Sequence, residues 1–108
     1  MNIEFSRSEI FTFNDIIDYQ TNSIVSKQLI KCPAGNVTVF AFDKGESLST
    51  HSAPFDALVQ VVDGKAEIVI DEKPFHLEAG QSIIMPANIP HAVKASEKFK
   101  MVLTMIKG

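Results

Sequence analysis

Apolar residues occur along this chain in short runs. Residues suited to turns separate these runs at intervals of roughly 8 to 12 positions. This rhythm is typical of a β-sandwich or a β-barrel, in which each short strand is followed by another strand. The apolar runs predict strands over residues 24–30, 37–42, 57–62, 65–70, 75–77, 82–85, 92–95 and 100–106. We therefore predict an all-β fold.

Two places along the chain carry more specific local signals. Asp63 and Gly64 separate two apolar runs, and an Asp-Gly pair in this setting predicts a tight β-hairpin between residues 59–62 and 66–70. Nearer the N-terminus, residues 8–19 are the best helical candidate, because four apolar side chains can share one face of a helix there: Phe11, Phe13, Ile16 and Ile17. A shorter helix capped by Asn14 or Asp15 is the alternative.

Composition and charge narrow the class of protein. A chain of 108 residues with 45% hydrophobic residues can bury one core, so we expect a single domain. The 10 basic and 13 acidic residues are dispersed, which offers no basic surface to nucleic acid or to an anionic membrane. No apolar run approaches the roughly 18 residues of a membrane-spanning helix, and the N-terminus lacks the signal-peptide pattern. We expect a cytoplasmic protein whose single cysteine, Cys32, is an inert thiol.

Two of the three histidines lie in segments with a recognisable pattern. The first segment reads GESLSTHSAPFDALVQVVDG over residues 45–64, and the second reads GQSIIMPANIPH over residues 80–91. These segments resemble the two motifs of the cupins, Gly-x5-His-x-His-x(3–4)-Glu-x6-Gly and Gly-x5-Pro-x-Gly-x2-His. Six residues stand at the family spacing: Gly45, His51, Gly64, Gly80, Pro86 and His91.

The resemblance implies a small single-domain cupin, which is a double-stranded β-helix or jelly-roll barrel. On this basis we expect residues 23–108 to form the barrel. Residues 1–22 would then pack on the barrel or on a partner chain, because their apolar side chains have no place in the core. Cupin barrels commonly pair, so the resemblance also implies a homodimer.

The metal site that the family carries is incomplete in this sequence. A complete cupin site holds a divalent ion with three histidines and one carboxylate, but Ala53 and Ala57 stand where the second histidine and the glutamate belong. Asp56 is adjacent to the glutamate position, although strand alternation turns it away from the face of Ala57. It becomes a ligand only if the preceding loop shifts by one residue. The remaining candidate ligands are His51 and His91.

The sequence leaves two interpretations of this pair open. In one, His51 and His91 hold a divalent transition metal such as iron, manganese, nickel or zinc, with other groups completing its shell. In the other, the two imidazoles line a metal-free polar pocket. The third histidine, His76, is expected to face solvent, because Phe75 and Leu77 take the inward face of their strand.

We expect the pocket in either case to bind a small molecule, with apolar walls because alanines replace two ligands. The residues expected to line it are His51, Ala53, Ala57, Val59, Met85, His91 and Met101. Cupins host enzymes as well as binding proteins, so a metal-dependent dioxygenase or isomerase that uses His51 and His91 is the alternative. No residue is assigned a catalytic role from the sequence.

Overall fold

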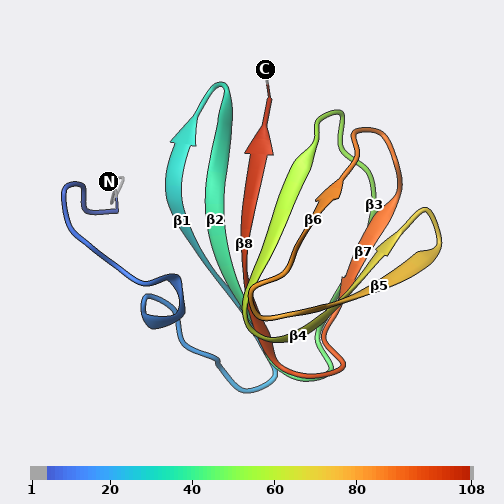
Figure 1. Cartoon of the computed structure of the whole chain (residues 1–108), viewed down its shortest axis with the longest axis horizontal. Coiled ribbons are helices and arrows are strands. Elements are labelled where there is room, and N and C mark those ends of the chain that lie inside the picture. The colour runs from blue at the N-terminus through green and yellow to red at the C-terminus, as the bar shows by residue number, and fades with distance from the viewer. Residues whose placement is uncertain (1–4, 108) are drawn as a thin grey trace.

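The structure is a computed structural model, which describes residues 5–107 (Figure 1). Within this range the chain forms eight strands and one turn of 3-10 helix. These are η1 (Phe13–Asp15), β1 (Ile24–Cys32), β2 (Gly35–Phe42), β3 (Ser47–His51), β4 (Ala57–Ile70), β5 (Lys73–Glu78), β6 (Ser82–Met85), β7 (His91–Lys94) and β8 (Phe99–Ile106). The predicted all-β fold is confirmed, and no helix in residues 5–107 is long and apolar enough to span a membrane.

The strands form one antiparallel sheet that curls into a jelly-roll barrel (Figure 1). The strand order is β1-β2-β8-β4-β7-β3, while β5 and β6 also pair with β4. Strand β4 connects the two walls of the barrel, because its first half pairs with β8 and β6 and its second half pairs with β7 and β5. The two walls therefore share one long strand.

The predicted hairpin at Asp63 and Gly64 is wrong, because β4 runs through this position without reversing. The register between β4 and β8 shifts between Val61 and Asp63, and Gly64 has a φ of 73°. Glycine adopts this left-handed conformation without steric cost. The extra residue of this bulge is therefore Val62, directly before the Asp-Gly pair, and the bulge bends β4 from one wall to the other.

The predicted helix over residues 8–19 is also wrong, since only η1 is helical. An isolated short helix is marginal unless an apolar face packs against something. Here the apolar side chains of this segment pack separately on the outer face of β1, β2 and β8, in a cluster around Ile17, Leu29, Val39, Ala41 and Val102. Phe13 and Ile16 join this cluster, whereas Ile10 is fully exposed.

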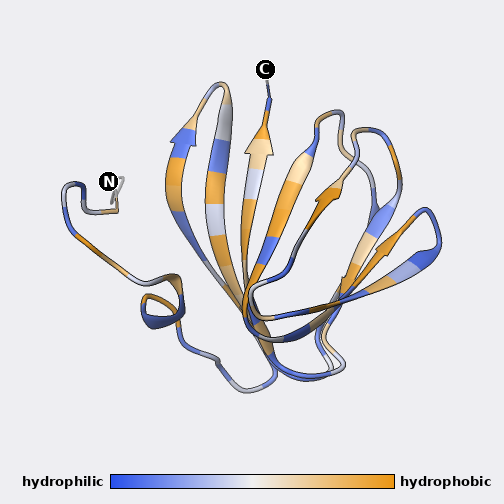
Figure 2. Cartoon of the chain, in the orientation of Figure 1, coloured by the Kyte–Doolittle hydropathy of each residue, from blue (hydrophilic) through white to orange (hydrophobic). Residues whose placement is uncertain are grey.

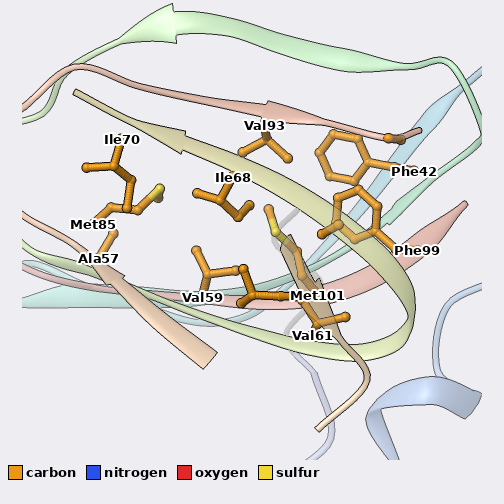
Figure 3. Packing of buried hydrophobic residues seen from close by; sticks show 13 residues of the cluster. Phe42, Ala57, Val59, Val61, Ile68, Ile70, Met85, Val93, Phe99 and Met101 are labelled. Carbon is orange, nitrogen blue, oxygen red and sulfur yellow. The ribbon is translucent and has the colours of Figure 1, made fainter. Parts of the chain in front are cut away.

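A larger apolar cluster fills the inside of the barrel. Figure 2 shows apolar residues on the strands of both walls, and Figure 3 shows their side chains interleaving in the interior. Phe42 and Phe99 stack at 4.6 Å between ring centroids, near the bulge in β4. Met101 also points inward and is buried, as the alternation of the last strand predicts, and Leu103 and Met105 pack on the same cluster.

A polar contact fixes the N-terminal segment to the bend in β4. The hydroxyl of Tyr19 donates a hydrogen bond of 2.6 Å to Asp63 Oδ2. Burial of the hydroxyl raises the pKa of Tyr19 above its usual value, and the hydrogen bond to Asp63 and the negative charge of Asp63 raise it further. The ammonium of Lys100 donates to the carbonyl oxygen of Asn14 at 2.7 Å. Residues 5–22 thus lie against the barrel wall through both apolar and polar contacts.

Candidate functional site

The two motif histidines are brought together at one end of the barrel, which we call the mouth. His51 is the last residue of β3 and His91 is the first residue of β7, and the two are partners in the β3–β7 register. Their ring centroids are 4.5 Å apart and the planes cross at 71°. The Nε2 atoms of the two rings lie 3.2 Å apart.

Both rings are oriented by backbone carbonyl groups. His51 Nδ1 lies 2.9 Å from the carbonyl oxygen of Ser49, and His91 Nδ1 lies 3.3 Å from the carbonyl oxygen of Ile89. A carbonyl oxygen only accepts, so each Nδ1 carries the hydrogen and donates it. Each neutral ring therefore presents the lone pair of Nε2, and the two lone pairs converge on one region.

The loop before His91 is held in place by the segment that follows His51. The backbone N–H of Asn88 donates to the carbonyl oxygen of Ala53 at 2.7 Å, and the backbone N–H of Ala87 donates to Asp56 Oδ1 at 2.8 Å. Asn88 has a φ of 65°, a conformation that asparagine tolerates better than most other side chains. Asp56 thus acts on the loop that positions His91.

Burial makes the two histidines electrostatically different. His91 is 6% exposed, whereas His51 is exposed to solvent at the rim. Burial lowers the pKa of His91, the neighbouring His51 lowers it further, and the hydrogen bond to the Ile89 carbonyl opposes the shift. Neutral His91, with Nε2 unprotonated, is therefore favoured in the folded protein near pH 7.

This shift predicts how stability depends on pH. The pKa of His91 is lower in the folded state than its ordinary value of about 6.5. Below pH 6.5 the unfolded chain therefore binds more protons than the folded protein does. The metal-free protein should therefore lose stability as the pH falls below about 6.5. Thermal unfolding of wild type and His91→Gln at pH 7.5 and 5.5 measures this. An equal fall in Tm for both proteins would contradict the role of His91.

The other residues predicted to line the pocket lie at different depths below the histidines. Ala57 and Met85 are register partners at the mouth end of the inner cluster, close to Ile70, which is itself the register partner of His91 (Figure 3). Val59 and Met101 lie farther from the mouth and are almost fully buried. Ala53 is half-buried in the loop between β3 and β4.

In the part of the chain that the structure describes, no His, Cys, Asp or Glu side chain joins the histidine pair as a third ligand. Among residues 5–107, no group of three or more His, Cys, Asp or Glu side chains is arranged to hold a metal ion. His76 is exposed on β5, where it is the register partner of Glu67. Any ion at the histidine pair would therefore need water or a bound small molecule to complete its shell.

The sequence did not reveal two features of this site, nor one unpaired polar atom buried in the barrel. Ser49 and Ile89 orient the histidines through backbone carbonyls, which leave no signature in side-chain type. Strand β3, SLSTH, was not predicted because it is mostly polar and exposed. Asn36 was also missed: its buried Oδ1 has no hydrogen-bond partner, the only such side-chain atom in the described part of the chain.

The comparisons agree with this fold and identify the family. Residues 38–107, more than half of the chain, match the family described as "Cupin domain". The chain belongs to the cupins. A conserved protein of unknown function from Streptococcus pyogenes is 35% identical with a TM-score of 0.92, and the match covers 96% of this chain and 91% of that one.

Two further solved structures are informative. A cupin 2 conserved barrel domain protein from Leptotrichia buccalis is 47% identical with a TM-score of 0.87, over 90% of this chain and 47% of that one. A salicylate 1,2-dioxygenase from Pseudaminobacter salicylatoxidans is 15% identical with a TM-score of 0.72, over 80% of this chain and 27% of that one. The second likeness shows the fold alone. Among curated proteins, none matches the chain.

Proposed function

We propose that this cupin binds a small molecule at the mouth of its barrel, through a divalent transition metal held by His51 and His91. The observation that carries the proposal is the separation of 3.2 Å between the two Nε2 atoms. Two imidazole nitrogens bound to one tetrahedral ion, each at about 2.0 to 2.1 Å, stand roughly 3.3 Å apart. The pair thus has the spacing that one ion requires.

The surroundings of the pair also suit metal binding. Histidines that bind metals usually donate the other ring N–H to a carbonyl or carboxylate, as both Nδ1 atoms do here. The lowered pKa of His91 favours the neutral form, which is the form that binds an ion. Imidazole ligands suit zinc, iron, nickel and copper, and carboxylate or water ligands would complete the shell.

We expect the small molecule to find space at the mouth because two side chains there are short. Ala57 and Ala53 replace the bulkier ligands of a complete cupin site, and both lie in segments that lead to the histidine pair. An ion held by two protein ligands keeps several open positions, and a bound carboxylate or hydroxyl group can fill them. When bound, the metal would supply a Lewis acid at the mouth.

Metal binding by purified protein tests this proposal. We expect wild-type protein to bind one Zn²⁺ or Ni²⁺ per chain in calorimetry, with an affinity that falls at least tenfold in His51→Ala/His91→Ala. His76→Ala is the matched control, because it removes an exposed histidine outside the site. An equal loss on His76→Ala, or unchanged binding by the double variant, would refute the site.

A metal-free pocket is the second candidate, favoured by the lack of a third protein ligand within residues 5–107. The two Nε2 atoms would then form a hydrogen bond with each other, in which one ring donates a hydrogen from Nε2 and the other accepts it. In that case calorimetry detects no binding of any of these ions at the pair. Activity as a dioxygenase or isomerase stays a prediction.

We also propose a homodimer that uses the outer face of β1, β2 and β8. This face carries a hollow of about 690 Å³ beside the N-terminal segment, with Phe11 and Ile30 in its lining, both substantially exposed. Ile106 is exposed on the neighbouring end of β8. Such a surface is typical of a protein interface. Light scattering should give twice the mass of the chain, and Ile30→Lys should yield the monomer.

A further inference from the structure

Asn36 is unusual among the buried residues of this protein. It is 9% exposed, and its Oδ1 atom is buried with no hydrogen-bond partner. A buried acceptor without a partner costs free energy, because water satisfied it in the unfolded chain. Asparagine is also disfavoured within strands. The fold alone gives no reason for an amide at this position.

The register of the strands places Asn36 on the inward face. Asn36 is the partner of Met105, and four residues farther along β2, Phe40 is the partner of Met101. Met101, Met105 and Phe40 all pack in the inner cluster, whereas Val37 and Val39 belong to the outer cluster. Because side chains alternate along a strand, the amide of Asn36 shares the inner face.

Asn36 also lies at the mouth end of the barrel. Met105 is the register partner of both Asn36 and Ala57, and Ala57 is in turn the partner of Met85. One row of inward residues thus runs across β2, β8, β4 and β6. Ala57 and Met85 pack with Ile70, the register partner of His91. Asn36 therefore belongs to the same end of the barrel as the histidine pair, on the opposite wall.

We propose that Asn36 is a ligand-binding residue whose Oδ1 accepts a hydrogen bond from the small molecule at the mouth. This inference rests on the proposed function and adds a chemical class to it. The ligand carries an oxygen group that reaches the histidine pair and, at its other end, a hydroxyl or N–H group that donates to Asn36. A hydroxy acid is the simplest compound with both groups. Met105, a flexible side chain beside Asn36, moves aside to admit the donor.

The length of the ligand is what a series of probes can measure. We would titrate zinc-supplemented protein with glycolate, 4-hydroxybutyrate and 6-hydroxyhexanoate, and with acetate, butyrate and hexanoate as counterparts without the hydroxyl group. The hydroxy acid whose length matches the distance from the histidine pair to Asn36 should bind about three- to tenfold tighter than its counterpart. This is the gain in affinity that one hydrogen bond to a buried acceptor provides. In Asn36→Leu this preference should vanish, while binding of the plain acids is unchanged.

Two further variants and one stability measurement complete the test. Asn36→Asp keeps an acceptor and should keep the preference, and Thr38→Val changes the next inward position of β2 and should leave it unaltered. Ligand-free Asn36→Leu should have a higher Tm than wild type, because the unpaired acceptor is gone.

The outcomes separate the two proposals. Binding of acids without any preference for a hydroxyl group, a preference retained in Asn36→Leu, or a lower Tm of that variant would overturn the role of Asn36. Those results would leave metal binding at His51 and His91 intact. Failure of the zinc-supplemented protein to bind any acid would overturn the proposed function, and the inference with it.

Discussion

Replacing Ala57 by glutamate is expected to strengthen Zn²⁺ binding on the order of 100-fold, because it returns a carboxylate to the cupin position at the mouth. Ala57 is the first residue of β4, is 4% exposed and faces inward beside Met85. A glutamate there lies on the same inner face as Ile70, the register partner of His91. Calorimetric titration of wild type and Ala57→Glu measures the difference.

The stability of the same variant should also depend on whether zinc is bound. Without metal, Ala57→Glu should unfold at a lower temperature than wild type, because a carboxylate is buried without a partner. Zinc should then raise the Tm of this variant more than that of wild type. Leu58→Glu is the matched control, since it adds the same charge one residue later on the opposite face of β4. Equal zinc affinity in the two variants would contradict the position that we assign to Ala57.

Gly64→Ala should be strongly destabilising, with an expected loss of about 3 to 5 kcal/mol. A Cβ atom at this residue would collide with the carbonyl group of Lys98, and the φ of 73° is strained for alanine. The carbonyl cannot withdraw easily, because it precedes Phe99, the register partner of Gly64. Since small domains have a total stability of about 5 to 15 kcal/mol, this loss would remove a large share of it.

Gly80→Ala separates the two causes of this loss. Gly80 has a φ of 94°, but a Cβ atom there would meet nothing within 4 Å. This variant should lose only the cost of the left-handed backbone, about 1 to 2 kcal/mol. Urea unfolding of both variants gives the comparison. Equal losses of unfolding free energy would show that the close approach of Gly64 to Lys98 adds nothing to the cost of an alanine at Gly64.

The sequence was sufficient to predict the fold class and to pair the two histidines. Alternating apolar residues mark most strands because each strand has one face in the core. The two motifs place His51 and His91 at the same end of the barrel, where they are register partners. The motif spacing predicts this pairing because, in a sheet of fixed register, the position of a residue along its strand determines which residue of the next strand lies beside it.

The features that could not be predicted depend on contacts distant in the sequence. The Asp63-Gly64 pair favours a hairpin locally, but pairing of both halves of β4 with other strands makes a bulge the better structure. The apolar residues of the N-terminal segment predict a helix. In the structure their side chains instead pack individually against the outer face of the sheet, without a common helical face. The unpaired amide of Asn36 emerges only when its neighbours are known.

The most direct test of the proposed metal site at the histidine pair is anomalous diffraction from crystals of the protein grown with Zn²⁺. We expect one strong anomalous peak at the mouth, about 2.0 to 2.1 Å from Nε2 of both His51 and His91. Density for water or a bound acid should complete the shell of the ion. Zinc bound elsewhere, with the two Nε2 atoms still facing each other and no anomalous signal beside them, would contradict metal binding by His51 and His91.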